Sequence, residues 1–258
     1  FAPEEAREGL YTLLAFNAEI AKTREVVSEP LLGEIRLQWW RDALERIYSD
    51  PEGDFEDHAV LAGLANIIKH TKLSRDNLDQ LIDTRARDMI DEPPEDEAEL
   101  RTYAVGTAAT LNAAWLEILA PADGDQPATV QKASEYVSIA WALTGLLRSS
   151  GSLAGYQRIM IPETVMQQFG FDKYAFFKGQ PNFEIKAATK HLAELARVEI
   201  SQARTLMGGK VDKCFLPVFL QATLAELYLK RIEKLDCNPF SPEIEDGRPL
   251  RQLKLTFK

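Results

Sequence analysis

Side chains that usually mark a disulfide framework, a metal site or a membrane-spanning helix are scarce in this sequence. Cys214 and Cys237 are the only cysteines, and neither stands in a CxxC or Cys/His spacing, so we expect two reduced thiols. His58, His70 and His191 are too scattered along the chain to indicate a metal site. A run of about 18 apolar residues is also missing, which argues against a membrane-spanning helix.

Basic residues are also fewer than acidic residues. The chain has 30 Lys and Arg against 40 Asp and Glu, a formal net charge of -10, and a pI near 5.0. Without a long basic stripe, nucleic acid is excluded as a partner, and broad adsorption to anionic lipid is disfavoured, although local peripheral contact with a membrane stays open. The motifs GxGxxG, HExxH, GxSxG and the P-loop lysine motif are all absent.

The abundant feature is helical periodicity. Apolar residues recur at steps of three and four residues, which is typical of amphipathic helices. The predicted helices cover residues 13–27, 35–47, 58–70, 75–90, 95–119, 128–147, 185–206 and 214–235. Polar residues rich in proline and glycine occupy 121–127, yet periodic helices lie on both sides of this loop. We therefore predict an all-α, single-domain helical bundle over residues 1–258.

The segment from residue 13 to residue 48 combines this periodicity with an unusual density of charge. Pro30 ends or kinks its first helix. The apolar stripe of its second helix is predicted to consist of Ile35, Trp39, Ala43, Leu44 and Ile47. The polar members of the segment are Asn17, Glu19, Lys22, Arg24, Glu25, Glu29, Glu34 and Arg36. A functional site and an ordinary charged helix face are both compatible with this pattern.

The same segment resembles the opening of the squalene/phytoene synthase family. The likeness is greatest to a divergent branch that includes a mitochondrial assembly factor of respiratory complex I and its alphaproteobacterial relatives. Ala15 and Phe16 are kept, but the positions of the family's aspartate-rich DDxxD-type motif read AKTRE, residues 21–25. Two carboxylates one turn apart can hold Mg²⁺ against a diphosphate, whereas Lys22 would repel the cation.

A second segment, ALTGLLRSSGSLAGYQRIMIP at residues 142–162, is similar to the family pattern QLTNILRDxxEDxxRGRxYLP. The matching positions are Leu143, Thr144, Leu147, Arg148, Arg158 and Pro162. Ser149, Ser152 and Leu153 stand where the resemblance implies acidic residues. A hydroxyl cannot replace the charge of a carboxylate toward Mg²⁺, and leucine offers no ligand.

The resemblance implies an isoprenyl diphosphate synthase fold around a central cavity and a set of candidate residues. The predicted phosphate-binding residues are Arg24, Arg36, Arg148 and Arg158; the metal ligands are Glu25, Glu29, Asp83 and Asp88; the cavity residues are Phe16, Trp39, Trp141 and Thr144. No catalytic residue is assigned, and Mg²⁺ is the implied cofactor only if the protein is an enzyme. Another interpretation of Asp83 is an ion pair with Arg87, four residues further along the same helix.

Three functions follow from these observations. We expect a non-catalytic factor that binds a protein partner, a lipid, or both, because most of the implied metal ligands are missing while the surrounding pattern persists. An active Mg²⁺-dependent transferase that joins two prenyl diphosphates head to head is the alternative. A metal-independent carrier of an isoprenoid lipid is the third hypothesis. A bacterial cytoplasm or a mitochondrial matrix, with or without membrane association, is compatible with each.

Overall fold

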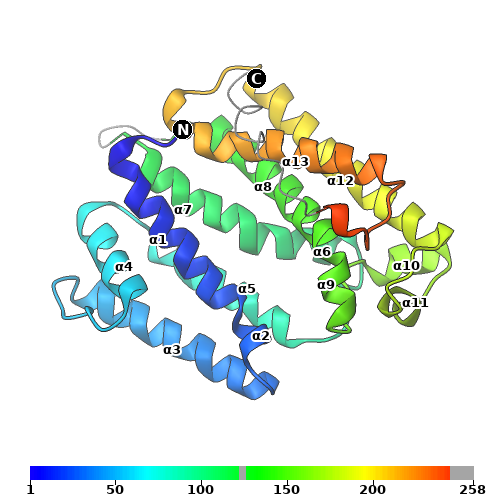
Figure 1. Ribbon diagram of the computed structural model, residues 1–258. Helices are drawn as coiled ribbons and strands as arrows, with labels where there is room; N and C mark the ends of the chain where they lie inside the picture. Colours follow the sequence, from blue (N-terminus) through cyan, green and yellow to red (C-terminus); the bar gives the residue numbers. More distant parts are fainter. Residues whose placement is uncertain (122–125, 245–258) are drawn as a thin grey trace. The chain divides into compact units, whose positions relative to one another are not determined.

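The computed structural model describes residues 1–121 and 126–244, and within these ranges it contains helices and no strand (Figure 1). The α-helices are α1 (Glu4–Ala21), α2 (Thr23–Val26), α3 (Pro30–Ser49), α4 (Ala59–His70), α5 (Arg75–Arg85), α6 (Glu97–Ala104), α7 (Thr110–Leu119), α8 (Ala128–Arg148), α9 (Ser150–Gly155), α10 (Glu163–Phe169), α11 (Lys173–Phe177), α12 (Phe183–Met207) and α13 (Leu216–Lys234). Three 3-10 helices, η1 (Ala86–Met89), η3 (Lys213–Phe215) and η4 (Pro242–Ile244), and one π-helix, η2 (Val105–Ala109), complete them. Most of the predicted loop at 121–127 and of the C-terminal tail lies outside the described residues.

Contacts divide the chain into two compact units. Unit 1 consists of Phe1–Ile90, Gly106–Glu135 and Lys210–Val218, and unit 2 of Asp91–Val105, Tyr136–Gly209 and the chain from Phe219 onward. The segments alternate along the sequence, and α8 and α13 contribute residues to both units. A single domain over residues 1–258 stays a prediction.

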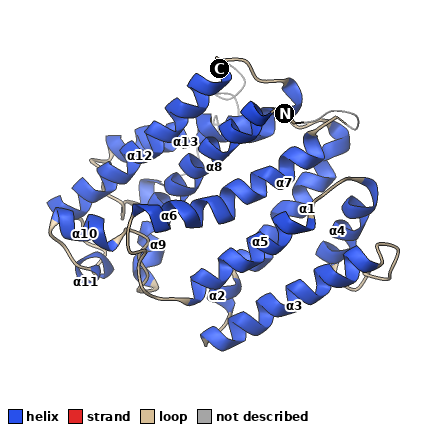
Figure 2. Cartoon of the chain, turned by 180° about the vertical axis from the view of Figure 1, so that it is seen from behind, coloured by secondary structure: helices blue, strands red, loops and turns tan. Residues whose placement is uncertain are grey.

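Unit 1 is built on α1, α3, α4, α5 and α7, which pack through their apolar faces (Figures 1 and 2). Phe16 of α1 and Trp40 of α3 are fully buried at its centre, with ring centroids 5.3 Å apart in an edge-to-face arrangement. Aromatic pairs in this geometry add to the stabilisation that their burial provides. Phe16 and Trp40 therefore help to hold α1 against α3.

The start of α3 differs from the prediction. The first helix ends at Ala21, well before Pro30, and Pro30 is the first residue of α3. Proline suits this position because its missing N–H has no partner at a helix start. The predicted stripe is correct at Ala43, Leu44 and Ile47 but wrong at Ile35 and Trp39, which are exposed. The remainder of the buried face of α3 consists of Gly33, Leu37 and Trp40.

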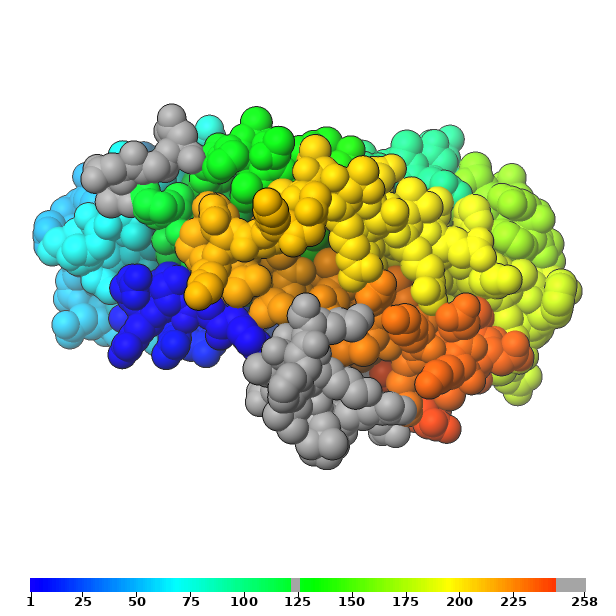
Figure 3. All heavy atoms as spheres, turned by 90° about the horizontal axis from the view of Figure 1, so that it is seen from above, coloured from blue at the N-terminus to red at the C-terminus, as the bar shows by residue number. Residues whose placement is uncertain are grey.

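Unit 2 has its own core, formed by α10, α12 and the parts of α8 and α13 that belong to it. In Figure 3 the yellow spheres of α12 lie against the orange spheres of α13. Arg204 of α12 pairs with Glu226 of α13, Nη1 to Oε1 at 2.8 Å. The helix α12 ends at Gly208, whose left-handed conformation (φ 56°) is favourable for glycine, as the sequence predicts.

Two predicted elements are divided or replaced. The predicted helix over 75–90 is α5 followed by the 3-10 helix η1, and the predicted helix over 95–119 is interrupted by the π-helix η2. Residues 148–157, expected to break the helical structure, contain the short helix α9. No helix within the described ranges is long and apolar enough to span a membrane.

Candidate functional site

Polar side chains gather in unit 1 where α1 ends and α3 begins. The Glu19 carboxylate is the centre of this group, because one oxygen, Oε1, accepts a hydrogen bond from Lys22 and the other, Oε2, accepts one from Arg36 Nη2 at 2.8 Å. These three side chains are partly buried, so solvent screens their pairing less than at an open surface. We call Glu19, Lys22 and Arg36 the Glu19 cluster.

The Glu19 cluster includes one of the positions at which the family resemblance implies an acidic metal ligand. Lys22 occupies that position, and both of its neighbours in space, Glu19 and Arg36, are already engaged with each other. A divalent cation placed here would meet two basic groups and one carboxylate whose oxygens are both hydrogen-bonded. This arrangement does not fit Mg²⁺, but it stabilises the contact between α1 and α3.

The predicted metal ligands Asp83 and Asp88 lie in different surroundings. Asp83 of α5 is exposed, and its Oδ1 accepts bonds from Arg41 Nη2 at 2.7 Å and Nε at 2.9 Å. Asp83 is thus paired with α3 and not with Arg87, which lies on η1 and not on α5. Asp88 of η1 is buried, and its Oδ2 accepts a bond from Arg85 Nη1 at 3.2 Å. Arg85 also donates from Nη2 to Asn17 of α1 at 3.5 Å.

The other two predicted ligands, Glu25 and Glu29, lie on α2 and at the N-cap of α3. Both are exposed, and neither forms an ion pair within the part of the chain that the structure describes. Over residues 1–121 and 126–244, no group of three or more His, Cys, Asp or Glu side chains lies close enough together to hold a metal ion. The role of Glu25, Glu29, Asp83 and Asp88 as metal ligands therefore stays a prediction.

The predicted phosphate-binding arginines are divided between the units. Arg24 and Arg36 belong to unit 1, and Arg148 and Arg158 belong to unit 2. Arg24 is half-buried on α2, and Arg36 is engaged by Glu19. The Arg148 guanidinium lies over the Tyr228 ring, 3.7 Å from its centroid. Such a cation–π contact holds the side chain without a carboxylate.

Two hydroxyl groups of the second family-like segment, those of Thr144 and Ser149, are bonded to backbone carbonyls of α8. Thr144 Oγ1 donates to the Ala140 carbonyl at 2.7 Å, and Ser149 Oγ donates to the Leu146 carbonyl at 3.1 Å. These bonds satisfy the hydroxyls locally, as is common for serine and threonine in helices. This segment therefore provides neither a carboxylate nor a free hydroxyl at these positions.

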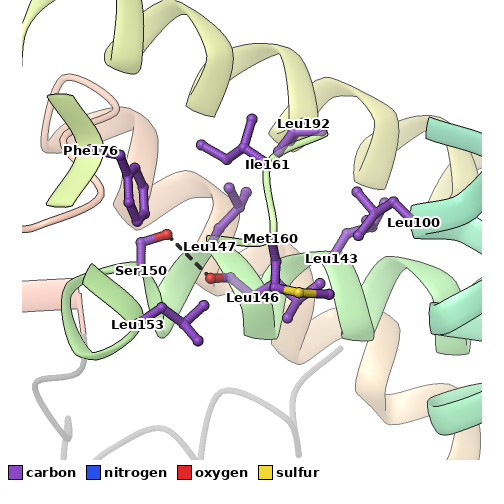
Figure 4. A pocket seen from close by; sticks show the side chains of 10 residues that line it. All are labelled: Leu100, Leu143, Leu146, Leu147, Ser150, Leu153, Met160, Ile161, Phe176 and Leu192. Carbon is purple, nitrogen blue, oxygen red and sulfur yellow. Dashed lines mark hydrogen bonds between the residues drawn. The ribbon is translucent and has the colours of Figure 1, made fainter. Parts of the chain in front are cut away.

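Unit 2 contains a small apolar pocket beside this segment (Figure 4). Its lining is apolar except for Ser150, whose Oγ donates to the Leu146 carbonyl at 3.2 Å. The pocket has room for about one water molecule. A prenyl chain does not fit into this volume.

The predicted cavity residues lie elsewhere. Phe16 is in the core of unit 1, and Trp39 is exposed on α3. In unit 2, Trp141 lies 6.3 Å from Tyr228, centroid to centroid, and Thr144 is fully buried. None of the four lines the pocket of Figure 4. A cavity formed by these residues stays a prediction.

The sequence pattern did not identify Arg41 and Arg85 as partners of the candidate carboxylates. Arg41 follows Trp40 on α3, and its partner Asp83 is 42 residues away along the chain. Periodicity assigns Arg41 only to a polar face of its helix. The pairing depends on how α3 packs against α5, which spacing within one helix cannot show.

Comparisons with known proteins agree with this fold. The squalene/phytoene synthase family model matches residues 1–257. The chain is 27% identical over 253 residues to the NADH dehydrogenase (ubiquinone) complex I assembly factor 6 of Bos taurus, a match that covers 98% of this chain and 74% of that protein. It is 24% identical over 249 residues to the 15-cis-phytoene synthase of Synechococcus elongatus, a match that covers 92% of this chain and 79% of that protein.

A solved dehydrosqualene synthase has the same fold. The TM-score is 0.80 at 17% sequence identity, and the match covers 98% of this chain and 86% of the other. A squalene synthase from Alicyclobacillus acidocaldarius superposes with a TM-score of 0.78. The all-α isoprenoid synthase type of fold, predicted from the sequence, is confirmed. This chain belongs to the squalene/phytoene synthase family.

Proposed function

We propose that this protein is a non-catalytic member of its family that acts by binding a protein partner, as an assembly factor does. The observation that carries the proposal is the Glu19 cluster. Lys22 stands where the family resemblance implies a metal-binding carboxylate, and its ammonium group and the Arg36 guanidinium occupy both oxygens of Glu19. Electrostatic repulsion at this position opposes the binding of the divalent cation on which the condensation of prenyl diphosphates depends.

The second family-like segment supports the same proposal. Ser149, Ser152 and Leu153 stand where the family resemblance implies acidic residues, and the Ser149 hydroxyl donates to the Leu146 carbonyl of α8. Loss of metal ligands from two separate segments is harder to compensate than loss from one, because replacement carboxylates would be needed at both places to balance the charge of the metal ions. A fold can keep its core while its site changes.

The relatives named as complex I assembly factors suggest the kind of partner. We infer that the partner is a protein component of a respiratory NADH dehydrogenase or of its assembly intermediates, in a mitochondrial matrix or a bacterial cytoplasm. Contact with a membrane surface would then be peripheral. An isoprenoid lipid stays a second ligand class.

The test is incubation of the purified protein with farnesyl or geranylgeranyl diphosphate, with and without Mg²⁺. Released pyrophosphate and extracted hydrocarbon would be measured beside an active phytoene synthase. We expect no condensed product above the level of the reaction without enzyme. Mg²⁺-dependent formation of a condensed product by a folded sample would refute the proposal.

The alternative function, a working head-to-head prenyl diphosphate transferase, is favoured by the match to 15-cis-phytoene synthase over 92% of this chain. It would require metals held by Glu25, Glu29, Asp83 and Asp88, with arginines on the phosphates. If the incubation yields product, Asp83→Asn together with Asp88→Asn should abolish it, because both changes remove a negative charge and keep the side-chain shape. Undiminished turnover in the double variant would exclude these two residues as metal ligands.

A further inference from the structure

The outer face of α3 exposes large apolar side chains that its own unit leaves uncovered. Leu31 is 68% exposed, Leu32 46%, Ile35 59% and Trp39 46%. At 100° per residue these four positions fall within an arc of about 100° on the helix. We call them the α3 strip. The opposite side of α3, including Leu37 and Leu44, is fully buried, so this helix has two apolar faces.

Single exposed apolar residues are ordinary, but a continuous strip of leucine, isoleucine and tryptophan is not. Trp39 is held in place there, because its ring lies edge-to-face against buried Trp40 at 4.9 Å and beside His58 at 5.5 Å, centroid to centroid. A rigid, half-exposed tryptophan loses little side-chain entropy when a partner covers it. The α3 strip therefore has the composition of an interaction surface.

Carboxylates border the strip, and neither Glu34 nor Asp42 forms an ion pair with any residue that the structure describes. Glu34 lies three residues after Leu31, and Asp42 three residues after Trp39, which makes each pair neighbours on the helix surface. Glu34, like Glu25 and Glu29 before the strip, forms no ion pair within the described part of the chain. The border of the α3 strip is therefore negatively charged.

The three basic residues of α3 contact other side chains of unit 1. Arg36 is bound to Glu19 at 2.8 Å, Arg41 to Asp83 at 2.7 Å, and Arg46 lies over the Phe55 ring, 5.5 Å from its centroid. Carboxylates of unit 1 balance the charges of Arg36 and Arg41, whereas Arg46 is exposed and keeps its charge. Four carboxylates, Glu25, Glu29, Glu34 and Asp42, therefore stand against one uncompensated cation of α3. An anionic lipid surface would be repelled by such a border. A second copy of the chain would bring two acidic borders together, which the formal net charge of -10 also opposes.

We propose that the α3 strip is the docking surface for a protein partner that presents an apolar helix face flanked by lysine or arginine. The apolar face of the partner would cover Leu31, Ile35 and Trp39, and its basic residues would pair with the carboxylates at the border, including Glu34 and Asp42. This inference rests on the proposed function, since it names the surface through which a partner-binding factor would act. A helix laid along an apolar face is a recurrent mode of recognition.

Synthetic peptides of about 18 residues, long enough for five helical turns, provide the probe. The first carries leucines on one helix face and lysines elsewhere, the second has glutamates in place of the lysines, and the third keeps the lysines but has alanines in place of the leucines. Binding to the full chain would be measured by fluorescence titration at low and physiological salt. We expect saturable binding of the first peptide alone, weakened by salt.

Matched variants locate the binding. Leu31→Gln with Ile35→Gln should weaken binding of the lysine–leucine peptide by about tenfold or more, because it removes two of the four apolar contacts of the surface. Glu34→Gln with Asp42→Asn should weaken it severalfold and reduce its dependence on salt. Val198→Gln with Leu206→Gln, at exposed positions of α12, and Glu4→Gln with Glu5→Gln, on α1, are the controls and should change binding by less than about twofold.

Several results would overturn the docking surface. One is absence of binding, and others are equal binding of the glutamate–leucine peptide or equal losses in the control variants. The protein could instead sediment with vesicles of phosphatidylcholine and phosphatidylglycerol. If Leu31→Gln with Ile35→Gln abolished that sedimentation, the strip would be assigned to a lipid surface. A dimer that the same variant dissociates would assign it to a second copy. Turnover of prenyl diphosphates would refute the proposed function alone, since the peptide measurements do not depend on it.

Discussion

At the scale of single residues, the sign of one side chain changes what the end of α1 can bind. Lys22 brings an ammonium group to Glu19, and Arg36 brings a guanidinium group to the same carboxylate. The resulting pairs join α1 to α3, which is a structural role. A position that the family resemblance assigns to metal chemistry has become part of the packing of unit 1.

Another partly buried carboxylate, Glu117 of α7, gives a prediction about pH. Burial raises the pKa of the Glu117 carboxyl above its ordinary value, although the Ser74 N–H, at 2.9 Å, and the Asn77 amide, at 2.9 Å, hydrogen-bond to it and act in the opposite direction. The folded protein therefore binds this proton more tightly than the unfolded chain. Its contribution to the free energy of unfolding is present below the unfolded pKa and is lost as the pH rises through the folded pKa.

The variant Glu117→Gln tests this prediction, because glutamine does not titrate. The free energy of unfolding of the wild type should fall relative to that of the variant as the pH rises from about 4 toward neutrality. Urea denaturation at several pH values measures the difference, and contributions from other groups cancel between the two proteins. A difference that is independent of pH, or that changes in the opposite direction, would contradict the assigned shift.

At the scale of secondary-structure elements, two segments pack closely where the π-helix η2 interrupts the predicted helix over 95–119. A Cβ placed on Gly106 of η2 would lie 2.3 Å from Thr84 Oγ1, 2.8 Å from its Cγ2 and 3.1 Å from its Cβ. Threonine is branched at Cβ, so rotation of its side chain cannot clear both branches. The approach of η2 to α5 therefore requires glycine at this position.

Gly106→Ala should lower the free energy of unfolding by about 1–3 kcal/mol, although alanine favours helix, because the added methyl group overfills the contact. Gly145→Ala on α8 is the matched control. A Cβ there meets no heavy atom within 4 Å, so this variant should stabilise the protein by about 0.5–1 kcal/mol. Urea denaturation measures both. Thr84→Ala should recover part of the loss in a Gly106→Ala background, and equal behaviour of the two glycine variants would refute the contact.

At the scale of the whole molecule, the two units have separate cores. If the chain is a single domain, both units should unfold together. Segments of both units alternate along the chain, and α8 and α13 contribute to each. Unfolding of one unit would break helices that belong to the other. We therefore expect one cooperative transition.

The tryptophans make this prediction measurable. Trp39, Trp40 and Trp115 belong to unit 1 and Trp141 to unit 2, so Trp141→Phe restricts the tryptophan fluorescence to unit 1. Far-ultraviolet circular dichroism follows the helices of both units. The two signals should give the same urea midpoint within error. Midpoints that differ would show that unit 1 unfolds independently and that the chain contains more than one domain.

The all-α class, the approximate extent of the helices and the family were determined by the sequence alone. They depend on local properties: the 3.6-residue period of apolar side chains, the glycine at the end of α12 and two short segments matching a family pattern. The sequence alone also showed that Lys22 and Ser149 stand where the family pattern has acidic residues. No packing information is needed to see that a side chain has changed its charge.

Only the tertiary structure decided which side chains are partners and which apolar residues are covered. Asp83 pairs with Arg41 across 42 residues of chain, and Ile35 and Trp39 are exposed although their spacing fits a buried stripe. Both outcomes depend on the rotation of α3 about its axis when it packs on its neighbours. Because α3 carries apolar residues on two sides, the period of its sequence fits either rotation, and the contacts of Leu37, Trp40 and Leu44 in the core of unit 1 select one of them.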